Sequence, residues 1–424
     1  MEFIKKIENK DTVFCIVGLG RVGLPLSCVF ANKGFVTYGV DVNKDLLDSV
    51  SKSISPFDDS ELQQSLEKAN ESGKLTVVKN VENISKEIDV IIITVGTPTK
   101  NNNVDYSQLY SALNEICKLG LKNKLIILRS TMPPGTTTDI ISPYLESKTK
   151  LKKGEDFLLA VCPERILEGH AIREINDLPE IIGGINKESD EIAAHVFKSI
   201  NPEKEILYTS VSGAELAKLF ANVYRYINFA IANEFAIWAE RYGLDANEII
   251  KIANFKYPRS NIPKPGFAGG PCLSKDGTFL DNNTTSSGII STAFKLNESI
   301  PQHVVNNIKN HVTNLLNKKI AVLGLSFKAN SDDLRDSPSV KLVEILKSFG
   351  ADVVVHDPHV KNTSSLKEVL EKPDIIILAT NHKEFENLQQ IISDSGCELV
   401  YDVWGMFNRN DFPNSKYLRF GSGN

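Results

Sequence analysis

The chain has 424 residues, of which 42% are hydrophobic and 24% charged, an ordinary globular composition that predicts about three domains at roughly 150 residues each. A net charge of -5 gives no sign of a nucleic-acid or membrane-surface partner, and no apolar run approaches the ~18 residues of a membrane-spanning helix. The six cysteines form no CxxC pair, which argues against a disulfide framework and against a metal site, and favours a cytoplasmic protein.

The first motif lies in TVFCIVGLGRVGLPLSCVFANKGFVTYGVDVN, which is typical of a strand, a glycine turn, a helix and a second strand. Asp41 ends the second strand, eighteen residues after Gly23, at the spacing of a dinucleotide site. The glycines would let backbone N–H groups approach a pyrophosphate, and Asp41 would hold the ribose hydroxyls of NAD rather than NADP. The motif comprises Gly18, Gly20, Arg21, Val22 and Gly23.

Three further strand-like runs each end in small, hydroxyl or proline residues. They are DVIIITV before GTPTK, KLIILRS before TMPPGTT, and DFLLAVC before PERILEG. In parallel sheets such carboxyl ends form the ligand crevice. The first α/β domain is therefore predicted over residues 1–205.

The segment from Ala214 to Tyr242 contains neither glycine nor proline and is apolar on most faces. This pattern predicts one long helix, buried between domains or subunits. Lys218 and Asn222 are four residues apart and share a face of it. A solvated stripe is the usual interpretation of such a pair, but their neighbours Leu219 and Val223 are apolar.

A second α/β pattern begins at KKIAVLGLSFK and continues through the strand-like runs ADVVVHD, DIIILAT and ELVYDVW. Of the fingerprint glycines only Gly324 remains, so a mononucleotide-like ligand and a purely structural duplicate are both open at this point. The predicted fold is α/β: two Rossmann-like doubly wound domains, at 1–205 and 317–424, joined by a long central helix and a small helical domain at 206–316.

One cysteine stands in an unusual setting, in the stretch PGFAGGPCLSKDG. Glycines precede Cys272, and Lys275 and Asp276 follow it. A nearby ammonium lowers the pKa of a thiol and makes it nucleophilic. A buried packing thiol is the alternative.

Seven stretches lie in one order: GLGRVGLPLS, GTPTK, RSTMPPGTT, CPERILEG, AELAKLFAN, GFAGGPCLSKD and GLSFKANSDDLRDSP. Together they resemble the UDP-glucose/GDP-mannose dehydrogenase family of nucleotide-sugar 6-dehydrogenases, from about residue 12 to 420. The resemblance implies a four-electron oxidation of a sugar C6 hydroxyl to a carboxylate with two NAD. Cys272 would trap the aldehyde as a thiohemiacetal, whose oxidation gives a thioester for hydrolysis.

The resemblance also implies roles for other residues. Lys218 and Asn222 would stabilise oxyanions at C6, and Asp276 would position water and the neighbouring ammonium. Glu164, with Thr131 near it, would take the proton of the hydrolytic water. Positions matching the family's cofactor contacts are Thr97, Thr131, Lys275 and Arg335, and those matching its substrate contacts are Glu164, Arg165, Glu168, Lys218, Asn222, Gly269 and Lys328. Arg259 resembles an arginine that reaches the pyrophosphate across a dimer interface.

The substrate is predicted from Arg165 in CPERILEG and from YPRSNIPKPGF, which look more like enzymes acting on UDP-N-acetylmannosamine or UDP-N-acetylglucosamine for cell-surface polysaccharide. The lysine of CLSKD points instead to a UDP-glucose 6-dehydrogenase, the alternative. Two other functional classes fit the sequence less well. They are a β-hydroxyacid type dehydrogenase, which also carries Lys-x-x-x-Asn, and a non-enzymatic nucleotide sensor. We expect at least a homodimer, because a two-fold interface commonly buries such an apolar helix.

Overall fold

The computed structural model describes residues 2–100, 103–271, 273–281 and 288–423. These residues form two compact units: residues 1–221 with 278–282, and residues 222–277 with 283–424. In the described ranges no helix has both the length and the apolar character needed to cross a membrane.

The first unit is built on an eight-stranded sheet in the order β10-β9-β8-β7-β4-β1-β2-β3. Every residue of the central strands β1, β4, β7 and β8 is buried, because helices cover both faces, and their sequences are accordingly continuous apolar runs. The order reverses between β1 and β4, which creates the switch point where such sheets bind ligands. In spatial order the strands are β10 (Ile206–Tyr208), β9 (Glu180–Gly184), β8 (Leu158–Val161), β7 (Leu125–Leu128), β4 (Val90–Ile93), β1 (Val13–Val17), β2 (Val36–Val40) and β3 (Leu75–Val78).

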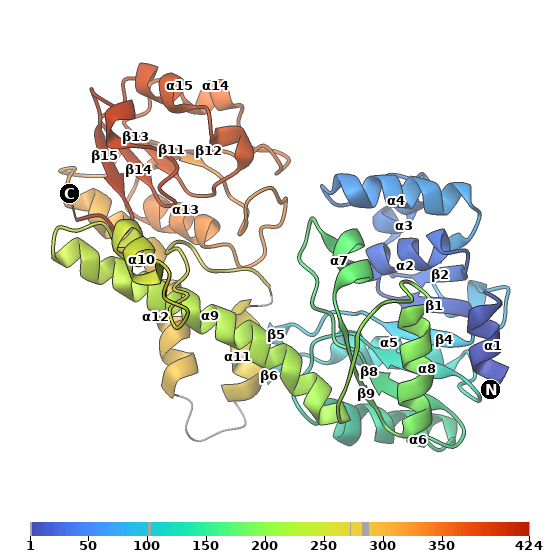
Figure 1. Ribbon diagram of the computed structural model, residues 1–424. Helices are drawn as coiled ribbons and strands as arrows, with labels where there is room; N and C mark the ends of the chain where they lie inside the picture. The colour runs from blue at the N-terminus through green and yellow to red at the C-terminus, as the bar shows by residue number, and fades with distance from the viewer. Residues whose placement is uncertain (1, 101–102, 272, 282–287, 424) are drawn as a thin grey trace. The chain divides into compact units, whose positions relative to one another are not determined.

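Two helical layers enclose this sheet. On one face, apolar side chains from α1, α2, α3, α4, α7 and α8 join one core, and Figure 1 shows α2, α3, α4 and α7 together. On the other, α5, α6 and the start of α9 complete a second core. The helices are α1 (Glu2–Glu8), α2 (Gly23–Asn32), α3 (Lys44–Ser51), α4 (Ser60–Glu71), α5 (Ser107–Cys117), the π-helix η2 (Thr136–Ile141), α6 (Ser142–Thr149), α7 (Ala171–Asp177) and α8 (Lys187–Lys198).

The predicted long helix is α9, which spans Val211–Arg241 and begins three residues earlier than the predicted start. Its first turns, with Ala214 and Leu219 fully buried, belong to the first unit, and the rest belongs to the second. Several of its large apolar side chains are exposed in the single chain, among them Phe235 and Trp238.

The second unit contains a five-stranded parallel sheet in the order β12-β11-β13-β14-β15, with the same reversal, here between β11 and β13. Helices α9, α10, α12 and α13 pack on one face, and α14 and α15 on the other. The strands are β11 (Lys319–Leu323), β12 (Asp352–His356), β13 (Ile375–Leu378), β14 (Leu399–Asp402) and β15 (Lys416–Arg419). The helices are α10 (Ala246–Asn254), α11 (Leu273–Asp281, of which residues 278–281 belong to the first unit), α12 (Gly288–Lys309), α13 (Pro338–Ser348), α14 (Leu366–Val369) and α15 (Gln389–Asp394).

The predicted fold class is confirmed: two Rossmann-like sheets and a central helix are present. The strands β3, β9, β10 and β15 were not foreseen. Three of them, β3, β10 and β15, are short strands at sheet edges with exposed residues, so their sequences lack the continuous apolar run that marks a buried strand. The fourth, β9, is mostly buried, but its sequence EIIGG starts with a charge and ends in two glycines, which is not a strand pattern. The domain boundaries at residues 205 and 316 remain a prediction.

Candidate active site

The glycine turn of the first unit lies between β1 and α2. Gly18 has φ +95°, a backbone conformation that glycine adopts without strain. A Cβ on Gly23 would lie 1.8 Å from the carbonyl oxygen of Gly18, so only glycine fits there. Among the described atoms, none lies within 4 Å of the place of a Gly20 Cβ. The turn is thus open on the Gly20 side, as the approach of a pyrophosphate requires.

Two further features fit NAD. Val22 occupies the N-cap position of α2 and has no polar side-chain atom with which to cap that end. A helix N-terminus without a side-chain cap can bind an anion such as a pyrophosphate. Asp41 follows β2, with one carboxylate oxygen accepting the N–H of Leu19 at 2.7 Å and the other that of Asn43 at 2.8 Å. Asp41 is partly exposed, and each of its oxygens keeps a second acceptor site for a ribose hydroxyl.

Hydrogen bonds join the loops that follow β1, β4 and β7 at the carboxyl ends of these strands. The hydroxyl of Thr94 donates to the carbonyl of Gly18 at 2.6 Å. The hydroxyl of Thr97 donates to the carbonyl of Thr131 at 2.5 Å, and that of Ser130 to the carbonyl of Val95 at 2.6 Å. The structure thereby brings together Thr97 and Thr131, which the sequence assigned to cofactor contacts.

Glu164 follows β8 and is 7% exposed. One carboxylate oxygen accepts the backbone N–H groups of Arg165 and Ile166 at 2.7 and 2.9 Å. The other accepts two donors of Arg129, at 2.7 and 2.6 Å. Burial alone would raise the pKa of Glu164, but Arg129, the two backbone N–H groups and Lys218 together lower it. Glu164 is therefore held as a carboxylate.

Arg129 and Glu180 were missed by the sequence analysis. Both are buried beside Glu164, and Arg129 also donates to Glu180 at 2.9 Å. Arg129 stands inside the RSTMPPGTT stretch, so its charge within an apolar strand end was the available signal. Nothing in the local sequence marks Glu180, which begins β9.

Glu215 on α9 is a third missed residue. It is 3% exposed and accepts hydrogen bonds from the N–H groups of Gly135 and Thr137 and from the hydroxyl of Thr137, at 2.7 to 3.0 Å. Glu215 stands three residues before Lys218, which is itself 9% exposed. The loop after β7 is thus tied to the turn of α9 that carries Lys218.

Two other predicted substrate contacts have partners within the first unit. Glu168 lies 3.8 Å from Arg21, whose guanidinium stacks on Phe57. The structure therefore places Glu168 beside a residue of the glycine turn. Arg165 donates to the carbonyl of Pro179. Its role as a substrate contact remains a prediction.

In the second unit, Asn222 and Asp276 form a buried pair. The amide of Asn222 donates to the carboxylate of Asp276 at 2.6 Å, and Asp276 is fully buried. The ammonium of Lys275 lies 3.9 Å from the other oxygen of Asp276. Three of the predicted residues thus meet around one carboxylate at the start of α11. Cys272, one residue before that helix, lies outside the described residues.

The glycines that precede the cysteine are needed for packing within the second unit. A Cβ on Gly269 would lie 2.5 Å from the carbonyl oxygen of Asp336, and one on Gly270 would lie 2.6 Å from the ring of Phe327. The N–H of Gly270 donates to the same carbonyl of Asp336 at 3.1 Å. The approach to Cys272 therefore packs against the loop after β11. A role for Gly269 in substrate contact stays a prediction.

The remaining predicted residues lie on loops of the second unit. Lys328 is half-buried in the loop after β11. Arg335 is 58% exposed and pairs with Asp333 at 2.5 Å. Arg259 is exposed after α10 and stacks on Tyr257 with 4.5 Å between guanidinium carbon and ring centre.

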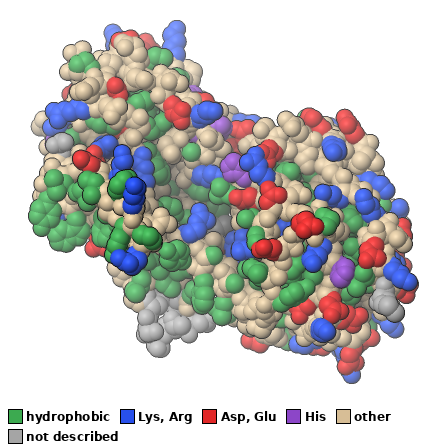
Figure 2. All heavy atoms as spheres, in the orientation of Figure 1, with side chains coloured by type: hydrophobic (Ala, Val, Ile, Leu, Met, Phe, Trp, Pro, Cys, Tyr) green, Lys and Arg blue, Asp and Glu red, His purple; other side chains and the backbone are tan. Residues whose placement is uncertain are grey.

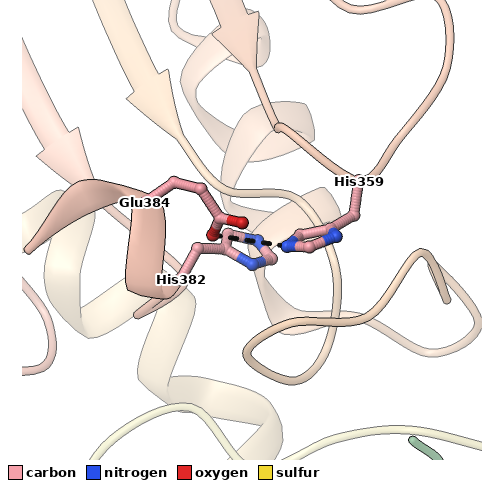
Figure 3. Close-up of side chains that lie close together, drawn as sticks. All are labelled: His359, His382 and Glu384. Carbon is pink, nitrogen blue, oxygen red and sulfur yellow. Dashed lines mark ion pairs between the residues drawn. The ribbon is translucent and has the colours of Figure 1, made fainter. Parts of the chain in front are cut away.

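Three side chains of the second unit could face a metal ion: His359, His382 and Glu384, with one ligand atom each within 4.8 Å of the others (Figure 3). Both nitrogens of His382 are engaged, however. Its Nδ1 accepts the N–H of Asn330 at 3.0 Å, so the ring proton is on Nε2, which donates to Asp357 at 3.0 Å. A metal ion at His382 would have to break one of these buried hydrogen bonds, so we assign the group to the structure of the loops.

The chain was compared with known protein families and structures. Three domain families match, all of the UDP-glucose/GDP-mannose dehydrogenase family: the NAD binding domain at residues 12–201, the central domain at 212–300 and the UDP binding domain at 321–409. A UDP-N-acetyl-D-mannosamine dehydrogenase from Pyrococcus horikoshii is 35% identical over 380 residues, 88% of this chain and 90% of that protein.

Solved structures agree. The UDP-D-ManNAc dehydrogenase of Pyrococcus horikoshii matches with a TM-score of 0.91 and 32% identity over 97% of this chain and 100% of that one. The UDP-N-acetyl-mannosamine dehydrogenase Cap5O from Staphylococcus aureus matches with a TM-score of 0.87 and 31% identity, over 97% and 98%. With the three domains in order across its length, the chain belongs to the UDP-glucose/GDP-mannose dehydrogenase family and is an NAD-dependent nucleotide-sugar dehydrogenase.

Proposed function

We propose that the chain oxidises the C6 hydroxyl of UDP-N-acetylmannosamine to the carboxylate, with two NAD consumed per sugar. The observation that carries this proposal is the set of UDP-N-acetyl-D-mannosamine dehydrogenases from several organisms that are 34–36% identical over about nine-tenths of the chain. The product would be an activated sugar acid, which we propose is used by glycosyltransferases that build cell-surface polysaccharide. UDP-glucose is the alternative substrate.

The proposed nucleophile is Cys272. Burial raises the pKa of each of the five described thiols: Cys15 and Cys28 to about 12, and Cys117, Cys162 and Cys397 above the usual range. A thiol with a raised pKa is a poor source of thiolate. This supports Cys272, the sixth cysteine, as the nucleophile, because the sequence places it between glycines and a lysine.

NAD, when bound, accepts the hydride that leaves C6 in each oxidation. Lys218 and the buried Asn222 would stabilise the oxyanion at C6, and Asp276 would keep the amide of Asn222 oriented through the 2.6 Å bond. In hydrolysis, an O–H bond of water breaks and Glu164 takes the proton. The hydroxide oxygen bonds to the thioester carbon, and the C–S bond breaks to return the Cys272 thiolate.

A substrate panel tests the proposed reaction. UDP-N-acetylmannosamine, UDP-N-acetylglucosamine and UDP-glucose would each be incubated with excess NAD, and NADH and acid would be quantified. We expect two NADH and one uronic acid per UDP-N-acetylmannosamine, and a preference over UDP-glucose of roughly tenfold to a hundredfold, because a pocket group that pairs with the acetamido is left unpaired by a hydroxyl. Turnover of UDP-glucose alone would establish the alternative.

The nucleophile is tested by Cys272→Ala, with Cys117→Ala as the matched control, because Cys117 is the most exposed thiol among the described residues. We expect the first variant to make no acid while it still binds NAD, and the second to retain the wild-type rate. Acid production by Cys272→Ala near the wild-type rate would exclude the covalent route.

We also propose that the chain acts as a homodimer. In the second unit, large apolar side chains on α9, α10 and the turn between them are exposed: Trp238 by 48%, Tyr242 by 71% and Ile252 by 67%. Figure 2 shows hydrophobic side chains gathered over these elements. A monomer rarely leaves so many apolar groups together in water, whereas a second copy would cover them.

The test of the dimer is sedimentation of Trp238→Glu against Ile391→Glu, a matched change at an apolar residue of α15 that is 51% exposed. We expect the wild type and Ile391→Glu to sediment as dimers at micromolar concentration and Trp238→Glu as a monomer. A wild type that is active as a monomer would contradict the proposal.

A further inference from the structure

Arg129, Glu164 and Glu180 form a buried charge cluster in the first unit, with exposures of 4%, 7% and 5%. Two nitrogens of the Arg129 guanidinium donate to one oxygen of Glu164, and the third donates to Glu180 at 2.9 Å and to the carbonyl of Cys162 at 3.2 Å. The guanidinium also stacks on the ring of Phe197. Burying three charges costs several kcal/mol per ion before their attraction is counted, so stability alone is a weak reason for such a cluster.

The sheet explains why these residues meet. Strand β9 runs antiparallel to β8, with Val161 opposite Gly183. Glu164 follows the carboxyl end of β8 and Glu180 begins β9, so the antiparallel direction brings both residues to the same end of the strand pair. Two carboxylates so close together repel. Arg129, at the end of the neighbouring strand β7, separates them and contacts both.

The two carboxylates differ in their hold on a proton. The pKa of Glu164 is lowered, as described above. The pKa of Glu180 is raised, first by burial and then by the charge of Glu164, against the opposing effect of Arg129. The charged groups that act on the pair are Arg129 from β7, Lys218 from α9 and Lys204 from the loop before β10. Lys204 is itself buried, and burial lowers its pKa.

We propose that Arg129 and Glu180 are positioning residues for Glu164. Arg129 orients the carboxylate of Glu164. The charge of Glu180, which contacts the same guanidinium, offsets part of the charge of Arg129, so that Glu164 can take the proton of water. The assignment rests on the proposed function of Glu164 in thioester hydrolysis. Without Glu180, the whole charge of Arg129 would act on Glu164 and weaken it as a base. Without the guanidinium fork, Glu164 would lose its orientation.

The first experiment compares the pH dependence of kcat in wild type, Glu180→Gln and Arg129→Lys, with the KM values for UDP-sugar and NAD. In Glu180→Gln we expect the acidic limb of the kcat–pH profile to move down by about one pH unit. We expect kcat to fall severalfold and both KM values to stay unchanged. In Arg129→Lys, which keeps the charge but not the fork, we expect the limb to move up and kcat to fall more than about tenfold. Loss of packing alone would not move the limbs in opposite directions.

The matched control is Asp89→Asn. Asp89 is another buried carboxylate of the same unit, bonded to Lys6 and to the N–H of Val13, and it is not among the charges that act on Glu164. We expect this variant to melt at a lower temperature than wild type and to keep the wild-type limb. An unchanged limb in Glu180→Gln, or one that moves equally in Asp89→Asn, would overturn the proposal.

The second experiment needs no substrate. Because the pKa of Glu180 is raised in the folded state, its ionisation opposes folding as the pH rises above its unfolded value. The melting temperature of Glu180→Gln relative to wild type should therefore improve from pH 4 to pH 7. A difference that is flat with pH would show that the folded state does not raise the pKa of Glu180, and it would overturn the part of the proposal that depends on Glu180. A wild type inactive on every UDP-sugar would refute the proposed function while this measurement still stands.

Discussion

The two α/β units share one local arrangement, a strand, a glycine turn, and an aspartate at the end of the second strand. We call this arrangement the frame, and the two units use it differently. In each, a strand leads into a glycine turn: the N–H of Gly18 donates to the carbonyl of Val40, and that of Gly324 to the carbonyl of His356, both at 2.8 Å. In each, the next N–H donates at 2.7 Å to an aspartate at the end of the second strand, Asp41 or Asp357.

The difference lies in what surrounds the aspartate. Asp41 is partly exposed, whereas Asp357 is 2% exposed and also accepts the N–H groups of Ser326 and His359 and the Nε2 proton of His382. The helix after each glycine turn shows the same difference. The hydroxyl of Ser337 caps the N-terminus of α13, whereas Val22 at the N-cap position of α2 makes no side-chain cap hydrogen bond. One frame is thus open to a ligand and the other is closed by the protein's own groups, so the UDP binding domain must hold its nucleotide with other residues.

The largest expected effect is at Gly23. A Cβ there would overlap the carbonyl of Gly18 at 1.8 Å, and backbone cannot move away cheaply. Gly23→Ala should cost about 3 kcal/mol or more of unfolding free energy, measured by urea denaturation. Gly20→Ala is the control, because its Cβ meets no described atom. That variant should keep wild-type stability and lose NAD affinity, and equal stability losses would show that the turn is not open.

Asp41→Asn should change cofactor choice rather than stability. The carboxylate of Asp41 repels a 2′-phosphate, so wild type should prefer NAD over NADP by about a hundredfold in kcat/KM, and the variant should lose most of that preference. Steady-state kinetics with both cofactors measures this. Comparable wild-type efficiency with NADP would contradict the assignment of Asp41.

Asp357 should contribute to stability and not to cofactor choice. Although burial works in the opposite direction, the hydrogen bond from His382 and the backbone N–H groups lower the pKa of Asp357 to about 2. For a carboxylate with a lowered pKa, the stabilisation is present above the unfolded pKa near 4 and is lost as the pH falls through about 2.

Asp357→Asn should therefore cost about 2 kcal/mol at pH 7 and should remove that part of the acid sensitivity between pH 4 and pH 2. Urea denaturation as a function of pH measures both. A variant as stable as wild type at pH 7 would mean that the second frame is not closed in the way described.

The smallest expected effect is at Ser337. Its hydroxyl accepts the N–H of Ser339 and donates to the carbonyl of Leu325 at 2.6 Å. Ser337→Ala should cost about 1 kcal/mol, the usual value of a helix cap. The variant's urea midpoint would be compared with that of Ser348→Ala, at the exposed end of the same helix. Equal shifts would remove the argument that capping closes this turn.

The sequence by itself determined the features that depend on neighbours in the chain. Continuous apolar runs predict the central strands because these are buried on both faces. The spacing from Gly18 to Asp41 predicts the cofactor turn because both ends of it belong to one βαβ unit. The order of the motifs predicts the family. Each of these signals is short-range or additive along the chain, so no contact has to be known beforehand.

Only the tertiary structure decided which polar groups meet. Arg129, Glu164 and Glu180 come from three strands, and the last faces the others because β9 runs antiparallel in an otherwise mostly parallel sheet, a direction that no local pattern encodes. Asp41 and Asp357 end similar strands, yet His382, 25 residues after Asp357, closes one site and not the other. Such pairings depend on strand order and direction, which are set by burial summed over the whole unit rather than by any one segment.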